Sequence, residues 1–412
     1  MTNTDDKLPL PLEGLLVLDV THIVAGPFCS MILADMGAEV IKIERPGLGE
    51  RGRSNLPFID GPDGGRISSR YLAVNRNKKS VAMDLRDARC KVAFQNMVRV
   101  ADVLLDNWGP GALDRLGFGY QRLEQLNSGL VYASITGYGD PDGPGSGPYS
   151  HWPANNPCVQ GMGGWMEMTG QPGSPPQMVG DNIGDSVPGV WTAMGIMLAL
   201  ETRRKTGRGQ HVDMAMYDCM VAHTTTSMPY FQATGVSTGR SRENMNSAQL
   251  TLKAKDGYVV LAGAGEEEKW VALWQLVGRE ELIQDDRYLG KAVGGEWYYD
   301  QVVPAIEEWS QHLPKLDVTL KLIEIGFSMG MVQDTADLDR CPHLEARNMF
   351  VESGDALGGR FRTVNTPIKL TGCVETPAGT PPLVGQHNRE ILCGIGGLTP
   401  EELAGMEQDG VS

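Results

Sequence analysis

Short apolar runs and amphipathic stretches alternate along the first 140 residues. The apolar runs predict buried strands at 15–19, 39–44, 103–106 and 130–136. The stretches with apolar positions three or four residues apart predict helices at 27–36 and 87–100. Because strands and helices alternate, we expect an α/β fold in which helices cover a parallel sheet.

A longer helix is expected at about 187–204. Pro188 is placed in its first turn, where a missing N–H costs least, and Gly207 follows its basic last turn as a stop. On this interpretation Asp185 lies just before the helix, where the backbone N–H groups of its first turn favour a carboxylate and could hold a developing oxyanion.

The pattern changes again after Tyr217. Asp256 and Gly257 sit between two β-rich runs and predict a hairpin. Helical patterns follow at 266–277, 301–312 and 316–325, and Thr399 with Glu402 forms the capping box of a last helix. We therefore expect a large domain that starts with residues 1–215, a smaller α+β domain at 225–330, and a return of residues 340–412 to the large domain.

Charge and composition narrow the function classes. The 412 residues carry 36 Lys+Arg against 51 Asp+Glu, so the formal net charge is −15. Such a surface repels nucleic acid and anionic lipid, and an anionic ligand must be captured by local basic groups. The longest apolar run, ten residues at 191–200, is too short for a membrane span. The polar N-terminus does not resemble a secretory signal, so we expect a cytoplasmic protein.

Cysteine and histidine spacing argues against a metal. The seven cysteines contain no CxxC pair and the seven histidines no HExxH pattern, so reduced thiols and no metal site are expected.

A dinucleotide site is one hypothesis for the first strand–helix–strand unit. Glu44 ends the second strand, where a carboxylate can bind a ribose hydroxyl. However, Gly26 is the single glycine between Asp19 and Pro27, so the G-x-G-x-x-G fingerprint is missing. An NAD-dependent oxidoreductase is therefore the weaker alternative, and Glu44 is more simply a polar strand end.

Six segments in a fixed order carry more information than any one motif. They are DVTHIVAGPFCS (19–30), GAEVIKIERPG (37–47), NRNKKSVAMDL (75–85), NWGPGALDRLGF (107–118), GDSVPG (184–189) and TGRGQHVDMAMYD (206–218). Together with LVGQH at 383–387, they closely resemble the class III CoA-transferases, the family of formyl-CoA transferase and carnitine CoA-transferase. The resemblance implies a Rossmann-like large domain, a small domain and an interlocked dimer, formed with a second copy or with a related subunit.

The resemblance implies that Asp185 is the catalytic nucleophile. Attack on an acyl-CoA gives a mixed anhydride and then an aspartyl-CoA thioester, which the acceptor acid attacks in turn. Coenzyme A is thus a co-substrate, and no tightly bound cofactor or metal is needed. An ordinary helix-capping aspartate is the simpler interpretation of Asp185 taken alone.

The resemblance also implies a set of residues that contact CoA. They are Ile23, Val24, Ala25, Arg45, Asn77, Lys78, Asn107, Trp108, Arg115 and Tyr138. Among them the three cations suit a ligand with several phosphate groups. Lys79 competes with Lys78 for this role, because spacing alone does not separate them.

The sequence departs from the family pattern at two places. The range 249–268 has Gly257, Gly263 and Gly265 instead of a tetraglycine loop, which puts specificity for formyl or oxalyl groups in doubt. Arg53 replaces a tryptophan, and either binds a second carboxylate on the acid, as in succinate, or is a surface arginine. We therefore expect succinyl-CoA or a similar donor and possible dicarboxylate acceptors.

An α-methylacyl-CoA racemase is the alternative within the same fold. Asn155 stands where the racemase histidine is expected, and His151 comes four residues too early. Because an amide does not shuttle protons near neutral pH, racemisation is disfavoured. A non-catalytic subunit of a heteromeric transferase is a further alternative, and the presence of Asp185 counts against it.

Overall fold

The computed structural model describes residues 8–61, 65–240, 249–262, 266–290, 297–354, 359–376 and 379–412. The chain divides into two compact units. The first combines Met1–Trp165, Met178–Thr224 and Leu344–Ser412, and the second combines Met166–Gln177 and Thr225–His343. The sequence did not suggest that the short segment Met166–Gln177 belongs with the second unit.

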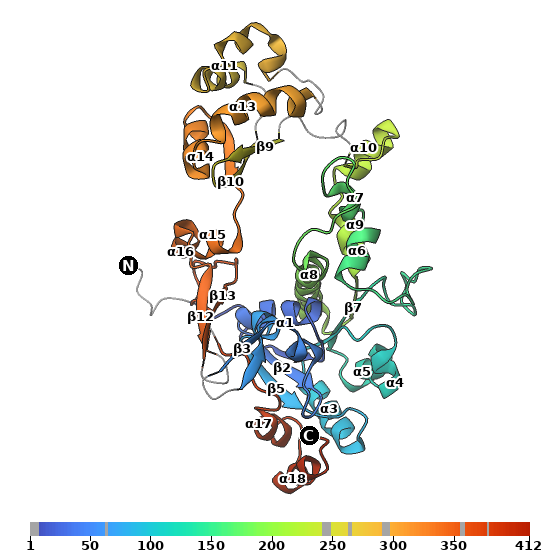
Figure 1. Ribbon diagram of the computed structural model, residues 1–412. Coiled ribbons are helices and arrows are strands. Elements are labelled where there is room, and N and C mark those ends of the chain that lie inside the picture. Colours follow the sequence, from blue (N-terminus) through green and yellow to red (C-terminus); the bar gives the residue numbers. More distant parts are fainter. Residues whose placement is uncertain are drawn as a thin grey trace. The chain divides into compact units, whose positions relative to one another are not determined.

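A six-stranded parallel sheet forms the centre of the first unit (Figure 1). Its strands are β1 (Leu16–Asp19), β2 (Glu39–Glu44), β5 (Lys78–Ala82), β6 (Val103–Asp106), β7 (Val131–Thr136) and β8 (His211–Ala215). The order is β5-β2-β1-β6-β7-β8, and every neighbouring pair is parallel. This is the Rossmann order, which reverses direction between β1 and β6 and leaves a crevice at their carboxyl ends.

The predicted α/β fold is confirmed, and the four predicted strands agree with the structure to within one residue. The sequence did not predict β5 and β8. Both strands carry charged or polar side chains where a buried strand is normally apolar, such as Lys78 in β5 and His211 in β8.

Helices pack on both faces of this sheet. On one face lie α1 (Ala25–Asp35) and α8 (Ile183–Thr206), and on the other lie α3 (Ala88–Val100), α17 (Asn388–Cys393) and α18 (Pro400–Gln408). The capping box of Thr399 and Glu402 is confirmed at the start of α18. Residues from the beginning and from the end of the chain thus pack into the same core.

The other elements of the first unit are short. They are the hairpins β3 (Phe58–Asp60) with β4 (Arg66–Ser68) and β12 (Phe350–Gly354) with β13 (Arg360–Val364), the 3₁₀ turn Arg51–Ser54, and the helices α2 (Ser69–Val74), α4 (Ala112–Leu116), α5 (Tyr120–Leu126), α6 (Asn156–Met162) and α9 (Met216–Ala222). Two further helices, α7 (Trp165–Met168) and α16 (Pro342–Ala346), lie at unit boundaries.

Helix α8 begins at Ile183, four residues before the predicted start, and Pro188 lies inside it. The prediction was wrong because it placed the proline in the first turn. Two glycines let the start of the helix approach its neighbours: a Cβ on Gly184 would lie 2.7 Å from the Asn156 carbonyl, and one on Gly189 would lie 2.8 Å from that of Ala25. By length and composition alone α8 is long and apolar enough to cross a membrane, a property that core helices of globular proteins share.

The second unit is an α+β arrangement. An antiparallel sheet of order β11-β10-β9 is formed by β9 (Gln249–Ala254), β10 (Gly257–Ala262) and β11 (Ser328–Met331). The predicted hairpin at Asp256 and Gly257 is confirmed, whereas Gly263 and Gly265 lie outside the described residues. The helices and helical turns are α10 (Ser227–Thr234), α11 (Glu267–Leu276), Glu280–Gln284, Asp286–Tyr288, Tyr298–Val302, α13 (Val303–Ser310), α14 (Lys315–Glu324) and α15 (Thr335–Asp339). The core contains Trp270 and Trp274.

Candidate active site

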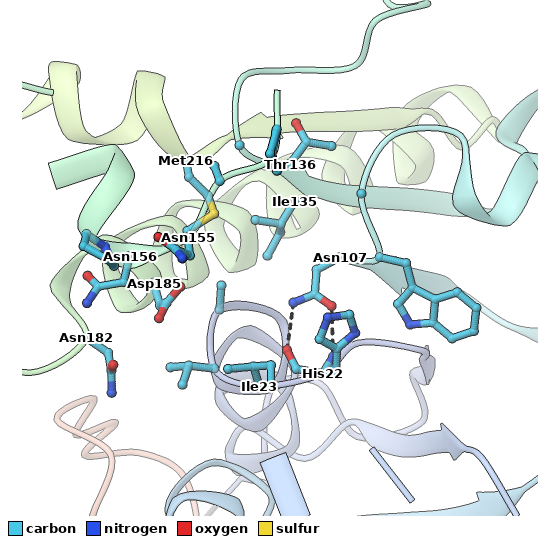
Figure 2. A pocket seen from close by; sticks show the side chains of 18 of the residues that line it. His22, Ile23, Asn107, Ile135, Thr136, Asn155, Asn156, Asn182, Asp185 and Met216 are labelled. Carbon is cyan, nitrogen blue, oxygen red and sulfur yellow. Dashed lines mark hydrogen bonds between the residues drawn. The ribbon is translucent and has the colours of Figure 1, made fainter. Parts of the chain in front are cut away.

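The largest of the cavities described here, about 890 Å³, lies at the carboxyl ends of β1, β6, β7 and β8. Segments that directly follow these four strands form part of its wall, and the starts of α6 and α8 form the rest. Figure 2 shows Asp185 and Asn182 on one side and His22 and Asn107 on the other. The cavity therefore occupies the crevice where open α/β sheets bind their ligands.

The segment after β1 is held by buried polar contacts. The Asp19 carboxylate accepts hydrogen bonds from Ser30 Oγ at 2.6 Å and Lys78 Nζ at 3.2 Å. Ile23 has a φ of 72°, which is unusual for a β-branched residue, and its N–H donates to the Glu50 carboxylate at 3.0 Å. These contacts fix the predicted residues Ile23, Val24 and Ala25 in the cavity wall.

Asn107 joins the segment after β6 to the one after β1. Its Oδ1 accepts from the His22 N–H and its Nδ2 donates to the His22 carbonyl, both at 2.9 Å (Figure 2). Trp108, the next residue, also lines the cavity. Both predicted residues thus lie at the cavity, with the Asn107 amide already occupied by backbone.

Asp185 is the third residue of α8 and faces the cavity. Its carboxylate forms no hydrogen bond or ion pair with any residue that the structure describes, and burial raises its pKa to about 6. The N–H groups around it are occupied: Gly184 donates to Asn156 Oδ1, and Asp185 and Ser186 donate to the Asn182 carbonyl. The prediction that these N–H groups hold an oxyanion is therefore wrong for these three residues.

Two smaller cavities continue from the first. One of about 400 Å³ shares His22, Arg51 and Trp108 with the Asp185 cavity. The other, of about 520 Å³, shares Arg45 and Trp108 with the second. Arg115 and Arg86 line this third cavity. The predicted residues Arg45 and Arg115 are thus brought together, and Trp108 lines all three cavities.

Lys78 and Asn77 lie elsewhere. Lys78 is fully buried, and its ammonium donates to Asp19, the Pro27 carbonyl and Asn75 Oδ1. Burial lowers its pKa to about 8, against the opposing effect of Asp19. Asn77 bonds to Asp35 and to the Gly379 N–H. Neither lines the three cavities, so the geometry argues for structural roles and against the predicted CoA contacts.

Tyr138 also lies outside the lining of these cavities. Its ring belongs to an aromatic cluster with Tyr149, Trp152 and Tyr217, at centroid distances of 5.7 to 6.2 Å. Trp152 does line the Asp185 cavity. Tyr138 therefore contacts the cavity wall through Trp152, and its predicted position near the thioester stays a prediction.

The contacts of Arg53 contradict both expectations for this residue, a second-carboxylate site and a surface position. Its guanidinium binds Glu44 through two hydrogen bonds of 2.6 Å and stacks 3.7 Å from the Tyr71 ring centroid. It is therefore neither a surface arginine nor free to bind a second carboxylate. Glu44 in turn is buried and also accepts from Ser80 Oγ, so it is not available to a ribose hydroxyl.

Sequence reasoning missed other residues of the Asp185 cavity. They include His22, Arg51, Arg70, Asn156 and Asn182, while Asn155 and His151 were considered for a racemase role alone. Burial first, and then Arg51, lowers the pKa of His22 to about 4, which keeps this imidazole neutral at neutral pH. His22 lies inside a quoted motif (19–30) and Asn182 lies two residues before another (184–189), whereas nothing in the sequence pointed to Arg70.

The fold is that of an α/β protein with a large cavity at the carboxyl edge of a parallel sheet, the place where such folds usually bind ligands. The chain belongs to CoA-transferase family III, because the model of that family matches residues 12–388. It is accordingly a CoA-transferase, an enzyme that uses CoA thioesters as co-substrates.

Individual relatives agree with this assignment. The succinyl-CoA:mesaconate CoA-transferase of Haloarcula marismortui is 35% identical over 386 residues, which are 92% of this chain and 95% of that protein. The succinyl-CoA–D-citramalate CoA-transferase of Chloroflexus aurantiacus is 32% identical over 97% of this chain and 98% of its own. The crystal structure of a CAIB/BAIF family protein from Brucella suis has a TM-score of 0.84 at 31% identity and covers 94% of this chain and 100% of that one.

Lys78→Met is expected to lower the free energy of unfolding by about 3–5 kcal/mol, because it removes a buried partner of the Asp19 carboxylate. Urea denaturation measures the change. Lys79→Met is the matched control: Lys79 is partly exposed and bridges Glu39 and Glu390 at the surface, so its loss should cost about 1 kcal/mol or less. Equal effects of the two variants would contradict the structural role of Lys78.

Asp185→Asn is expected to stabilise the protein at neutral pH. The native carboxyl keeps its proton up to about pH 6, well above its ordinary value of 3.8, so native stability is lost as the pH rises through 6. The asparagine variant does not ionise, so its stability relative to the native protein should rise by about 2–3 kcal/mol between pH 4 and pH 7. The measurement is urea unfolding of both proteins across this range, and a difference that does not change with pH would contradict the expectation.

Proposed function

We propose that this enzyme transfers coenzyme A from an acyl-CoA donor such as succinyl-CoA to a carboxylic acid, with Asp185 as the nucleophile. The observation that carries the proposal is the unpaired Asp185 carboxylate in a cavity at the carboxyl edge of the sheet. Ionised carboxylates in such surroundings are poorly solvated and therefore more nucleophilic than at an open surface.

The reaction consists of two symmetrical halves. Asp185 attacks the thioester carbonyl, CoA thiolate leaves, and the mixed anhydride of Asp185 and the donor acid remains. The thiolate then attacks the Asp185 carbonyl of this anhydride, which releases the donor acid and leaves an aspartyl-CoA thioester. The acceptor carboxylate attacks that thioester, and the returning thiolate attacks the acyl side of the second anhydride to give the new acyl-CoA and free Asp185.

Side-chain amides are the candidates for stabilising the oxyanions of these steps. The Asn155 side chain accepts from the Cys158 N–H, but its NH₂ group donates to no residue in the described part of the chain. The Asn156 amide is already bonded to Asp181 and Gly184. We therefore assign oxyanion contact to Asn155, a residue that the racemase comparison had brought to attention for another reason.

The nucleotide of CoA is proposed to occupy the third cavity, between Arg45 and Arg115, with the pantetheine running past Trp108 to Asp185. Support comes from the shared lining residues, which connect the three cavities in this order. Neither arginine forms an ion pair with a carboxylate among residues placed by the structure, so each is free to bind phosphate.

Quaternary structure is also proposed. Four residues on one face of α8 are exposed: Val190 (52%), Met194 (44%), Met197 (40%) and Leu198 (63%). Their spacing forms an apolar stripe that a second chain would cover, as in the interlocked dimer that the sequence led us to expect. Light scattering that returns the mass of a single chain would contradict this. The cytoplasmic location stays a prediction from the sequence.

An Asp185 adduct is expected in the first half-reaction. Intact-protein mass spectrometry after incubation with succinyl-CoA should show an added CoA, which hydroxylamine converts to an Asp185 hydroxamate that peptide mapping locates. Asp185→Ala should form no adduct and lose at least about 10³-fold in turnover. An adduct on another residue would defeat the assignment.

The native protein and Asp185→Ala also serve to test the racemase alternative. This alternative stays open because His151 lines the cavity of Asp185. Incorporation of deuterium at the α-carbon of a 2-methylacyl-CoA in deuterated water, without an Asp185 adduct, would favour racemisation.

Arg115→Ala is expected to raise KM for acyl-CoA about 10-fold, because a charge-assisted contact with phosphate is lost. Steady-state kinetics with CoA and dephospho-CoA thioesters measure the effect and show which phosphate the guanidinium meets. Arg122→Ala removes a nearby exposed arginine that lines none of the three cavities, and it should leave KM unchanged. Equal KM values for both variants would contradict the proposed CoA path.

A further inference from the structure

Two arginine residues line the Asp185 cavity, Arg51 and Arg70. Both residues are exposed, and neither pairs with a carboxylate in the described ranges. Some other arginines of this unit are paired with carboxylates, as Arg76 is with Asp35 and Arg203 with Asp102. Arg51 and Arg70 thus lack a carboxylate partner among the described residues, although the chain has 51 acidic and only 36 basic residues. They are available to bind an anion.

The two arginines differ in position. Arg51 lines the second cavity as well, beside His22 and Trp108, and therefore lies on the proposed path of CoA. Arg70 lines the Asp185 cavity and is absent from the linings of the second and third cavities. Arg70 is therefore the cation that belongs to the acyl end of the site.

The backbone at Arg70 is firmly held. It is the second residue of α2, whose N-cap Ser68 accepts the Tyr71 N–H at 3.3 Å. The Tyr71 side chain is fully buried, and its hydroxyl donates to the Pro382 carbonyl and accepts from Arg53. The base of the Arg70 side chain is thus fixed by core contacts.

The rest of the cavity offers no comparable partner for a second carboxylate. Its described polar side chains are mainly neutral amides, and Asp181 and Asp185 repel anions. A monocarboxylic acyl group needs no further charge once its reacting carbon meets Asp185. A dicarboxylic acyl group brings a second, free carboxylate into this cavity. That carboxylate loses water of hydration there, and a guanidinium group compensates for the loss by binding it.

We propose, on the basis of the proposed CoA transfer, that Arg70 is a specificity-determining residue that binds the distal carboxylate of a dicarboxylic acyl group. The same contact serves the succinyl group of the donor in the first half-reaction and the acceptor acid in the second. This role replaces the one that the sequence suggested for Arg53, whose guanidinium is bound to Glu44.

Two donors of equal length test the proposal, because succinyl-CoA ends in a carboxylate where butyryl-CoA ends in a methyl group. The rate of Asp185 adduct formation is measured in single turnovers by quenched-flow mass spectrometry with each donor. For Arg70→Ala we expect the succinyl-to-butyryl ratio of kcat/KM to fall about 30-fold from the native value. Arg70→Lys, which keeps the charge without the planar fork, should recover part of that ratio.

Arg66→Ala is the matched control, since Arg66 lies four residues earlier, pairs with Asp60 at the surface and lines none of the three cavities. Its succinyl-to-butyryl ratio should equal the native one. An unchanged ratio in Arg70→Ala, with adducts forming normally, overturns the role of Arg70 and leaves the CoA transfer intact. Native protein that forms no adduct with either donor overturns the proposed function instead. Thermal melting of each variant confirms that the compared proteins are folded.

Discussion

The buried Asp19 carboxylate at the end of β1 is the interaction on which the site depends. Lys78 from β5, Lys42 from β2 and Ser30 from α1 all meet it, and together they lower its pKa against the effect of burial. Removing one partner of a buried ion pair leaves an uncompensated charge, a cost of about 3–5 kcal/mol. The network therefore fixes three strands and the first helix relative to the segment that forms the cavity wall.

The strand order places a crevice at this edge of the sheet. After β1 the chain continues toward β2 on one side of the sheet, and after β6 it continues toward β7 on the other side. A crevice therefore opens between the segments that follow β1 and β6. The Asn107 amide links these segments by bonding both backbone groups of His22. Helix α8 supplies the opposite wall, and Gly184 and Gly189 allow its first turns to approach α6 and α1 closely enough to bring Asp185 to the cavity.

The distribution of positive charge separates cations that pair with buried carboxylates from cations that line the cavities. In the interior, Arg53 forms an ion pair with Glu44, and Lys78 forms one with Asp19. Arg45, Arg70 and Arg115 lie along the connected cavities without a carboxylate partner in the described chain. The unpaired arginines that line a cavity are therefore better candidates for an anion site than the motif residue Lys78, whose ammonium is bound to Asp19.

The sequence by itself determined the α/β class, four strands to within a residue, the hairpin at Asp256 and Gly257, and the family, because periodicity and local turn chemistry are written in neighbouring residues. It did not predict β5, β8 or the true start of α8, since buried charges such as Lys78 and an internal Pro188 contradict local rules and are tolerated through tertiary partners. Only the folded chain decided which cations meet carboxylates and which face the cavity. The sequence singled out Arg53 and not Arg70, but in the folded chain the Arg53 guanidinium is bound to Glu44, whereas Arg70 lines the cavity.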